Sequence, residues 1–216
     1  MPQAAEVLGG VLRFFPNMMI VTLIVLGITT GRVTWILVAL GALIVIIATV
    51  TTQNLVARLT SITASTDPAI LEACSLIPIF GTEYAATPSL WVALSTFFAT
   101  YIFMNANNIY TQTPTRVNKD KMAVQQRKGM GLISMFAILI LFVLIMFPRW
   151  RSTCETLLGM LTGILIGGLG GYGWWSILNA CGSNVFPDIH GVMLGLHPES
   201  LRTNPIACVT NVKPVA

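Results

Sequence analysis

The chain has 216 residues, of which 55% are hydrophobic and only 9% are charged, and its formal net charge is +4 at neutral pH. A soluble domain usually contains about 25% charged residues and keeps a polar face on each helix. This composition excludes a large soluble domain and predicts an integral membrane protein.

Charged residues are missing from long stretches of the chain. A helix needs about 20 mostly apolar residues to cross a hydrocarbon core about 30 Å thick. A barrel strand would alternate apolar and polar residues, and the run 133–147 does not alternate. We therefore expect an all-α membrane protein with about five transmembrane helices. The charge-free stretches are 14–31, 33–57, 84–115, 129–148 and 156–187.

The first two spans are expected at about 15–30 and 33–52. Only Gly31 and Arg32 separate them, which predicts a tight antiparallel hairpin. The residues before the first span include Glu6 rather than a basic segment, so we expect a retained span and no cleaved signal peptide.

The middle of the chain carries two helix-start signals of the same kind. Asp67-Pro68 predicts a short helix on the membrane surface at about 67–77, and Thr87-Pro88 predicts a third span at about 88–104. A polar loop is expected from 105 to 128.

The second half of the chain is expected to complete the bundle. The fourth span is expected at about 130–147 and the fifth at about 156–178, so that the bundle occupies 1–178. The segment 179–216 should be an extended tail, because Pro187, Pro198, Pro205 and Pro214 prevent a long helix.

The orientation is predicted from the lysines and arginines. Five spans place the two termini on opposite sides of the membrane. The side of the N-terminus contains Arg13, Arg58, Arg149 and Arg151. The side of the C-terminus contains Arg32, Arg116, Lys119, Lys121, Arg127, Lys128, Arg202 and Lys213. The positive-inside rule then predicts a cytosolic C-terminus. The five tryptophans lie near span ends, where indoles commonly anchor a helix at the lipid headgroups.

The fifth span contains glycines at a four-residue interval. Such spacing forms a groove along one helix face and lets another backbone approach closely. We interpret this as a helix-packing face, whose partner is either another span of this chain or another copy, as in a homo-oligomer. The glycines are Gly159, Gly163, Gly167 and Gly171.

The polar loop between the third and fourth spans is basic. Its positive charges suit phosphate groups or a protein partner. The alternative is that they only determine the orientation of the chain in the membrane. The loop lacks interleaved aromatic residues, so nucleic acid is not an expected partner. The basic residues are Arg116, Lys119, Lys121, Arg127 and Lys128.

The four cysteines separate by side of the membrane. Cys74 and Cys154 fall on one side and Cys181 and Cys208 on the other, which permits two disulfides or four free thiols. No metal site and no cofactor are expected, because the spacing of His190 and His197 matches no compact zinc signature.

The predicted spans contain no charged residue or histidine at mid-depth. Proton relays and ion pathways in membranes usually depend on such residues. We therefore expect a structural protein and not an enzyme. The alternative is a channel or small-solute permease subunit, in which the polar cluster at 49–54 would contact solute.

The segment EYAATPSLWVALSTFFATYIFMNANNIYT, residues 83–111, and the ending NPIACVTNVKPVA resemble membrane proteins of nucleocytoplasmic large DNA viruses, especially those of algae. The resemblance implies a virion protein of the internal membrane, which derives from the host endoplasmic reticulum, in contact with capsid or minor capsid proteins. Because such viruses encode thiol oxidases, it also favours a Cys181–Cys208 bond. The expected function is to anchor the capsid to this membrane through the polar loops and the tail.

Overall fold

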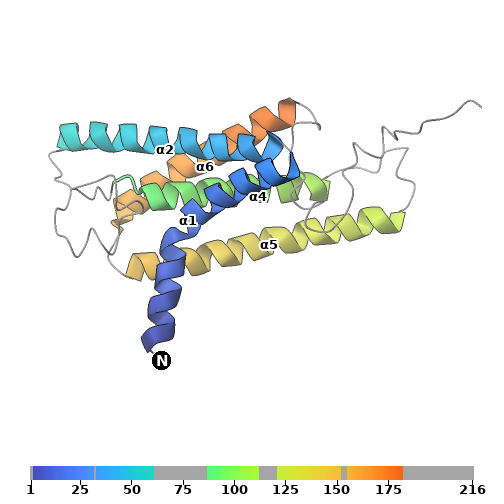
Figure 1. Cartoon of the computed structure of the whole chain (residues 1–216), viewed down its shortest axis with the longest axis horizontal. Helices are drawn as coiled ribbons and strands as arrows, with labels where there is room; N and C mark the ends of the chain where they lie inside the picture. Colours follow the sequence, from blue (N-terminus) through green and yellow to red (C-terminus); the bar gives the residue numbers. More distant parts are fainter. Residues whose placement is uncertain (1, 32, 61–86, 112–120, 152–154, 182–216) are drawn as a thin grey trace, which may run out of the picture.

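The computed structural model describes residues 2–31, 33–60, 87–111, 121–151 and 155–181. Within these ranges the chain forms five helices and no strand (Figure 1). The predicted surface helix at 67–77 and the tail beyond residue 181 lie outside the described residues. The helices are α1 (Pro2–Thr30), α2 (Val33–Thr60), α4 (Leu90–Thr111), α5 (Lys121–Arg151) and α6 (Leu157–Ala180).

Three of the helices are long and apolar enough to cross a membrane, namely Val33–Leu59, Lys128–Arg151 and Leu157–Ala180, and Phe14–Thr30 is a shorter apolar helix. Their outer faces carry large exposed hydrophobic side chains, including Ile47 on α2, Ile133 on α5 and Leu169 on α6. In water such a surface would be unstable, whereas lipid covers it without cost. The chain is therefore a multi-pass membrane protein.

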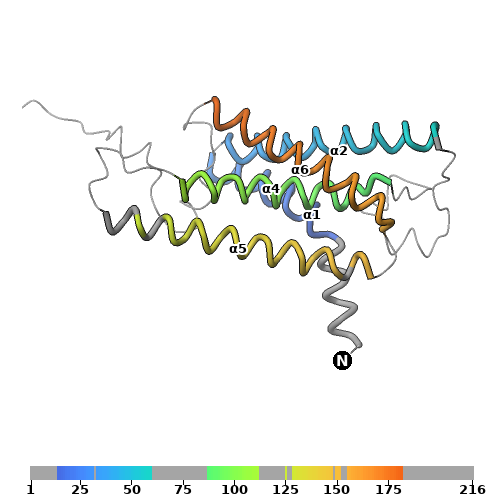
Figure 2. The backbone as a smooth tube through the Cα atoms, turned by 180° about the vertical axis from the view of Figure 1, so that it is seen from behind, coloured from blue at the N-terminus to red at the C-terminus, as the bar shows by residue number. Residues whose placement is uncertain are grey.

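Helices that follow one another along the chain run in opposite directions (Figure 2), and two close contacts illustrate this. Gly27 of α1 lies against Ile36 of α2 across the hairpin, where Gly31 adopts a left-handed φ of 63° that favours glycine. The beginning of α5 lies beside the end of α4, because Gly131 approaches the carbonyl oxygen of Ala106. The tight hairpin predicted between the first two spans is present.

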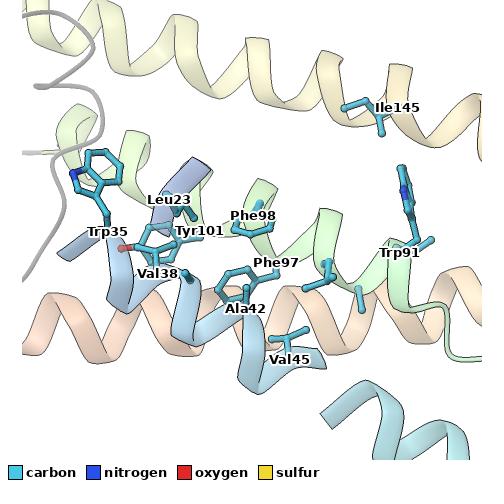
Figure 3. Packing of buried hydrophobic residues seen from close by; sticks show 14 of the residues in the cluster. Leu23, Trp35, Val38, Ala42, Val45, Trp91, Phe97, Phe98, Tyr101 and Ile145 are labelled. Carbon is cyan, nitrogen blue, oxygen red and sulfur yellow. The ribbon is translucent and has the colours of Figure 1, made fainter. Parts of the chain in front are cut away.

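The central helix of the bundle is α4. Its residues Trp91, Leu94, Phe97 and Tyr101 are among the most buried side chains. Figure 3 shows Trp91, Phe97 and Tyr101 between the neighbouring helices. Because protein rather than lipid surrounds α4, this helix can contain polar residues that a lipid-facing span would not tolerate. This explains why α4 is less apolar than α2 and α6.

The helix ends differ from the predicted boundaries. The helix α4 continues to Thr111, and α5 begins at Lys121 rather than near Met130. Much of the predicted polar loop is therefore helical. Pro148, which was expected to end the fourth span, lies inside α5, which continues to Arg151. Helices of a membrane protein readily extend past the hydrocarbon, and hydropathy alone does not reveal these polar turns.

The tryptophans are also placed differently from the interfacial belt that the sequence suggested. Trp35 and Trp91 are 5% and 2% exposed, so they pack inside the protein. Trp174 is half-buried against α2, and only Trp150 among these side chains is largely exposed, at 59%. Proximity to a span end is therefore not enough to place an indole in the headgroup layer.

Candidate functional site: a polar cluster where four helix ends meet

The end of α2, the beginning of α4, the end of α5 and the beginning of α6 meet at one end of the bundle. Gln53 of α2 donates a hydrogen bond of 2.6 Å from Nε2 to the carbonyl oxygen of Pro88, which precedes α4. The backbone N–H of Ser89 donates to the carbonyl oxygen of Gly159 in α6 at 3.1 Å. These bonds join three helices that are distant in the sequence.

The parallel helices α4 and α6 begin side by side, and each has a hydroxyl cap. Ser89 Oγ accepts from the N–H of Val92 at 3.2 Å, and Thr156 Oγ1 accepts from the N–H of Gly159 at 3.0 Å. Such caps satisfy backbone donors that have no partner within the helix. The hydroxyls of Thr87 and Thr156 lie 3.1 Å apart, which connects the α6 cap to the segment before α4.

A buried ion pair completes the cluster. Arg149 Nη2 of α5 lies 3.6 Å from Glu155 Oε1, and the two side chains are 9% and 0% exposed. The Arg149 Cζ lies 4.8 Å from the centroid of the Trp91 ring, a cation–π contact with α4. The guanidinium therefore holds the end of α5 against the beginnings of both α4 and α6.

The polar groups of this cluster interact with one another and with neighbouring backbone. Its amide, hydroxyl, guanidinium and carboxylate groups are directed at one another and at backbone groups of neighbouring helices. Across the described ranges, no group of three or more His, Cys, Asp or Glu residues could hold a metal ion. What this arrangement does physically is to fix four helix ends relative to one another.

The spaced glycines of α6 lie along α4. All four are buried. At Gly163, Gly167 and Gly171 an added Cβ would collide with backbone of the α4 region, and it would lie 2.9 Å from the Ser89 oxygen for Gly163 and 2.6 Å from the Phe97 oxygen for Gly171. Gly167 meets the carbonyl group of Ala93 in the same way. Each glycine thus faces a carbonyl one turn further along α4, which shows that the two helices are parallel and in constant register. The partner of this face is a helix of the same chain.

The remaining predicted site residues are only partly described. Lys121, Arg127 and Lys128 belong to the first turns of α5, whereas Arg116 and Lys119 lie outside the described residues. Cys181 follows α6 and is exposed. The other three cysteines, Cys74, Cys154 and Cys208, are not among the described residues, and neither are the two histidines. Each predicted disulfide includes at least one cysteine outside the described ranges, so both disulfides stay predictions.

Sequence reasoning missed two features of the core. The Arg149–Glu155 pair was hidden because Arg149 was considered only as a positive charge near a span end. Its sequence signal was the presence of opposite charges on the two sides of one short connection. The second feature is a set of buried α4 hydroxyls for which the described part of the chain offers no hydrogen-bond partner: Ser95 Oγ, Thr96 Oγ1 and Tyr101 OH.

Comparison with known proteins found no matching family model, no matching characterised protein and no matching solved structure.

Proposed function

We propose that the chain is a structural, non-enzymatic membrane protein of about five spans that anchors a protein shell to an underlying bilayer. In this proposal the shell is a viral capsid, the bilayer is the internal membrane of the virion, and the partners are capsid or minor capsid proteins. The C-terminal side faces the cytosol before the particle assembles.

One observation carries the proposal. The end of α4, the beginning of α5 and the end of α6 lie at the same end of the bundle, because Gly131 contacts Ala106 and Gly171 contacts Phe97. The basic connection between α4 and α5 and the tail after α6 therefore leave the bundle on one side. A protein that attaches a shell to a membrane needs its docking segments on one side of the bilayer.

The rigidity of the bundle supports the same function. The polar cluster fixes four helix ends, and the glycine face of α6 on α4 extends from this cluster into the middle of the bundle. A mechanical anchor transmits force between shell and lipid, so a bundle whose helices cannot slide is suited to it.

The proposal is tested by assembly and binding. The full-length chain, solubilised and immobilised, is incubated with purified minor capsid proteins of an algal large DNA virus. A second chain has glutamine at Arg116, Lys119, Lys121, Arg127 and Lys128, and a third chain lacks 182–216. We expect the intact chain to retain a capsid protein and the two variants to retain less. Equal retention by all three, or retention by none, contradicts the proposal.

The buried hydroxyls of α4 favour the alternative of a channel or permease subunit, because polar groups inside a bundle can contact solute. Solute and ion flux through liposomes that contain the purified chain separates the two functions. Flux that falls when Thr96 is replaced by Val would support the channel, whereas tight liposomes support the anchor.

A further inference from the structure

The helix α1 is longer than a membrane crossing requires. The helix contains 29 residues, or about 43 Å at 1.5 Å per residue, whereas the hydrocarbon core is about 30 Å thick. The charge-free, apolar part of its sequence begins at Phe14, directly after Arg13, and continues to Thr30. Residues 2–13 are therefore helix in excess of the span.

A proline separates the two parts of α1. Pro16 lies inside the helix and its side chain is fully buried. A proline in a helix interior removes one backbone hydrogen bond and clashes with the preceding turn, so it is a common place for a change of direction. The residues before Pro16 need not continue along the axis of the span.

The excess helix has two chemically distinct faces. At 3.6 residues per turn, positions 3, 6, 10 and 13 fall on one side, and they are Gln3, Glu6, Gly10 and Arg13. Gly9 also falls on that side. The opposite side receives only apolar residues, which are Ala4, Ala5, Val7, Leu8, Val11, Leu12, Phe14 and Phe15. No other described helix divides its residues in this way.

We infer that residues 2–14 form an amphipathic helix that lies in the plane of the membrane, at the boundary between headgroups and acyl chains. A helix with one apolar and one polar face is stable there, because its apolar side enters the lipid while its charges stay in water. Its apolar face continues the exposed surface of the span, where Phe14 and Met18 are 40% and 62% exposed. The partner of this segment is a lipid surface.

This inference goes beyond the anchoring function and does not depend on it. A helix in the membrane plane before the first span fixes the depth and tilt of the bundle in the bilayer. It also keeps Glu6 and Arg13 in water while the apolar residues between them contact lipid.

The test is a depth scan of the full-length chain in vesicles of phosphatidylcholine and phosphatidylglycerol. The four cysteines are replaced by serine, and single cysteines at positions 3 to 13 carry a nitroxide label. Collisions with oxygen report lipid, and collisions with a water-soluble nickel complex report water. We expect oxygen maxima at 4, 8, 11 and 12 and nickel maxima at 3, 6, 10 and 13, with no trend in depth along the segment.

The control is the same scan over positions 18 to 26, where a crossing helix predicts a depth that increases steadily by about 1.5 Å per residue. A steady increase in depth over 3 to 13 would show that the segment continues the span and would overturn the inference. Uniform exposure to nickel without periodicity would overturn it equally, because the segment would then lie away from the lipid. The result does not depend on any single variant, since the periodicity is read from all positions that reconstitute.

Discussion

Gly167 of α6 lies so close to the carbonyl group of Ala93 in α4 that no side chain fits between them. The two helices approach backbone to backbone at this point. Such a distance allows weak Cα–H···O contacts and many dispersion contacts, which hold transmembrane helices together where the hydrophobic effect does not. The stability of the bundle is therefore expected to depend on glycines of α6 according to the face that each one occupies.

Replacing Gly167 by alanine is expected to lower the free energy of unfolding by about 1–3 kcal/mol, the usual cost of overpacking. The obstacle is backbone, which cannot move aside as a flexible side chain can. The measurement is a titration from mild detergent micelles into sodium dodecyl sulfate, followed by circular dichroism. The matched control is Gly173→Ala, because nothing lies within 4 Å of a Cβ at position 173. Equal unfolding midpoints for the two variants would contradict the assignment of the packing face.

A second glycine is coupled to a tryptophan. Trp174 of α6 donates from Nε1 to the carbonyl oxygen of Leu37 at 2.9 Å, and its ring covers Gly41, where a Cβ would lie 2.6 Å from Nε1. Gly41→Ala is expected to push the indole away and break this bond, at a cost of about 0.6 kcal/mol for the bond plus the lost packing.

A double-mutant cycle checks this coupling. In a Trp174→Ala background, Gly41→Ala should have little effect on the unfolding midpoint, because the indole it displaces is absent. If Gly41→Ala costs the same in both backgrounds, then the tryptophan is not the residue that requires glycine at position 41.

The three long apolar helices and the glycine interval could be predicted from the sequence because lipid imposes a simple rule on them. A segment in contact with hydrocarbon must be apolar over its whole length, and a close crossing needs small residues at a fixed interval. The hairpin at Gly31 could also be predicted, because only Gly31 and Arg32 separate two apolar segments. These features are properties of one segment or of two adjacent ones.

The sequence did not reveal which helix is central or which residues meet at the end of the bundle. The contact of Arg149 with Trp91 joins residues that belong to different helices, and no local pattern specifies it. The burial of Trp35 was missed because indoles near span ends usually face the headgroups. Helix ends were misplaced because hydropathy detects only apolar segments. It does not detect polar helical turns, such as those that begin α5 at Lys121.

Removing one partner of the Arg149–Glu155 ion pair is expected to lower the free energy of unfolding far more than replacing both partners. Replacing Arg149 by Met leaves a buried carboxylate without its cation, and Glu155→Leu leaves a buried cation, so each change is expected to cost about 3–5 kcal/mol. The double variant loses both charges together and is expected to unfold much closer to the unmodified chain. The same detergent titration measures all four members of the cycle. Additive losses in the double variant would show that the two residues act independently.

Replacing either of two serines in the α4 region by alanine is expected to change the stability in opposite directions. Ser89 Oγ caps α4 by accepting from the N–H of Val92, so Ser89→Ala is expected to cost about 1 kcal/mol. Ser95 Oγ is buried and has no hydrogen-bond partner in the described part of the chain. A buried hydroxyl without a partner costs about 1–3 kcal/mol in desolvation, so Ser95→Ala is expected to be neutral or stabilising.

Unfolding midpoints of Ser89→Ala, Ser95→Ala and the unmodified chain decide this comparison under identical detergent conditions. The order expected from lowest to highest stability is Ser89→Ala, the unmodified chain and Ser95→Ala, with the last two allowed to coincide. A marked loss of stability in Ser95→Ala would mean that its hydroxyl bonds to a group or a buried water in the folded protein. The interior of α4 would then contain a satisfied polar network, and Thr96→Val and Tyr101→Phe would be expected to lower stability as well.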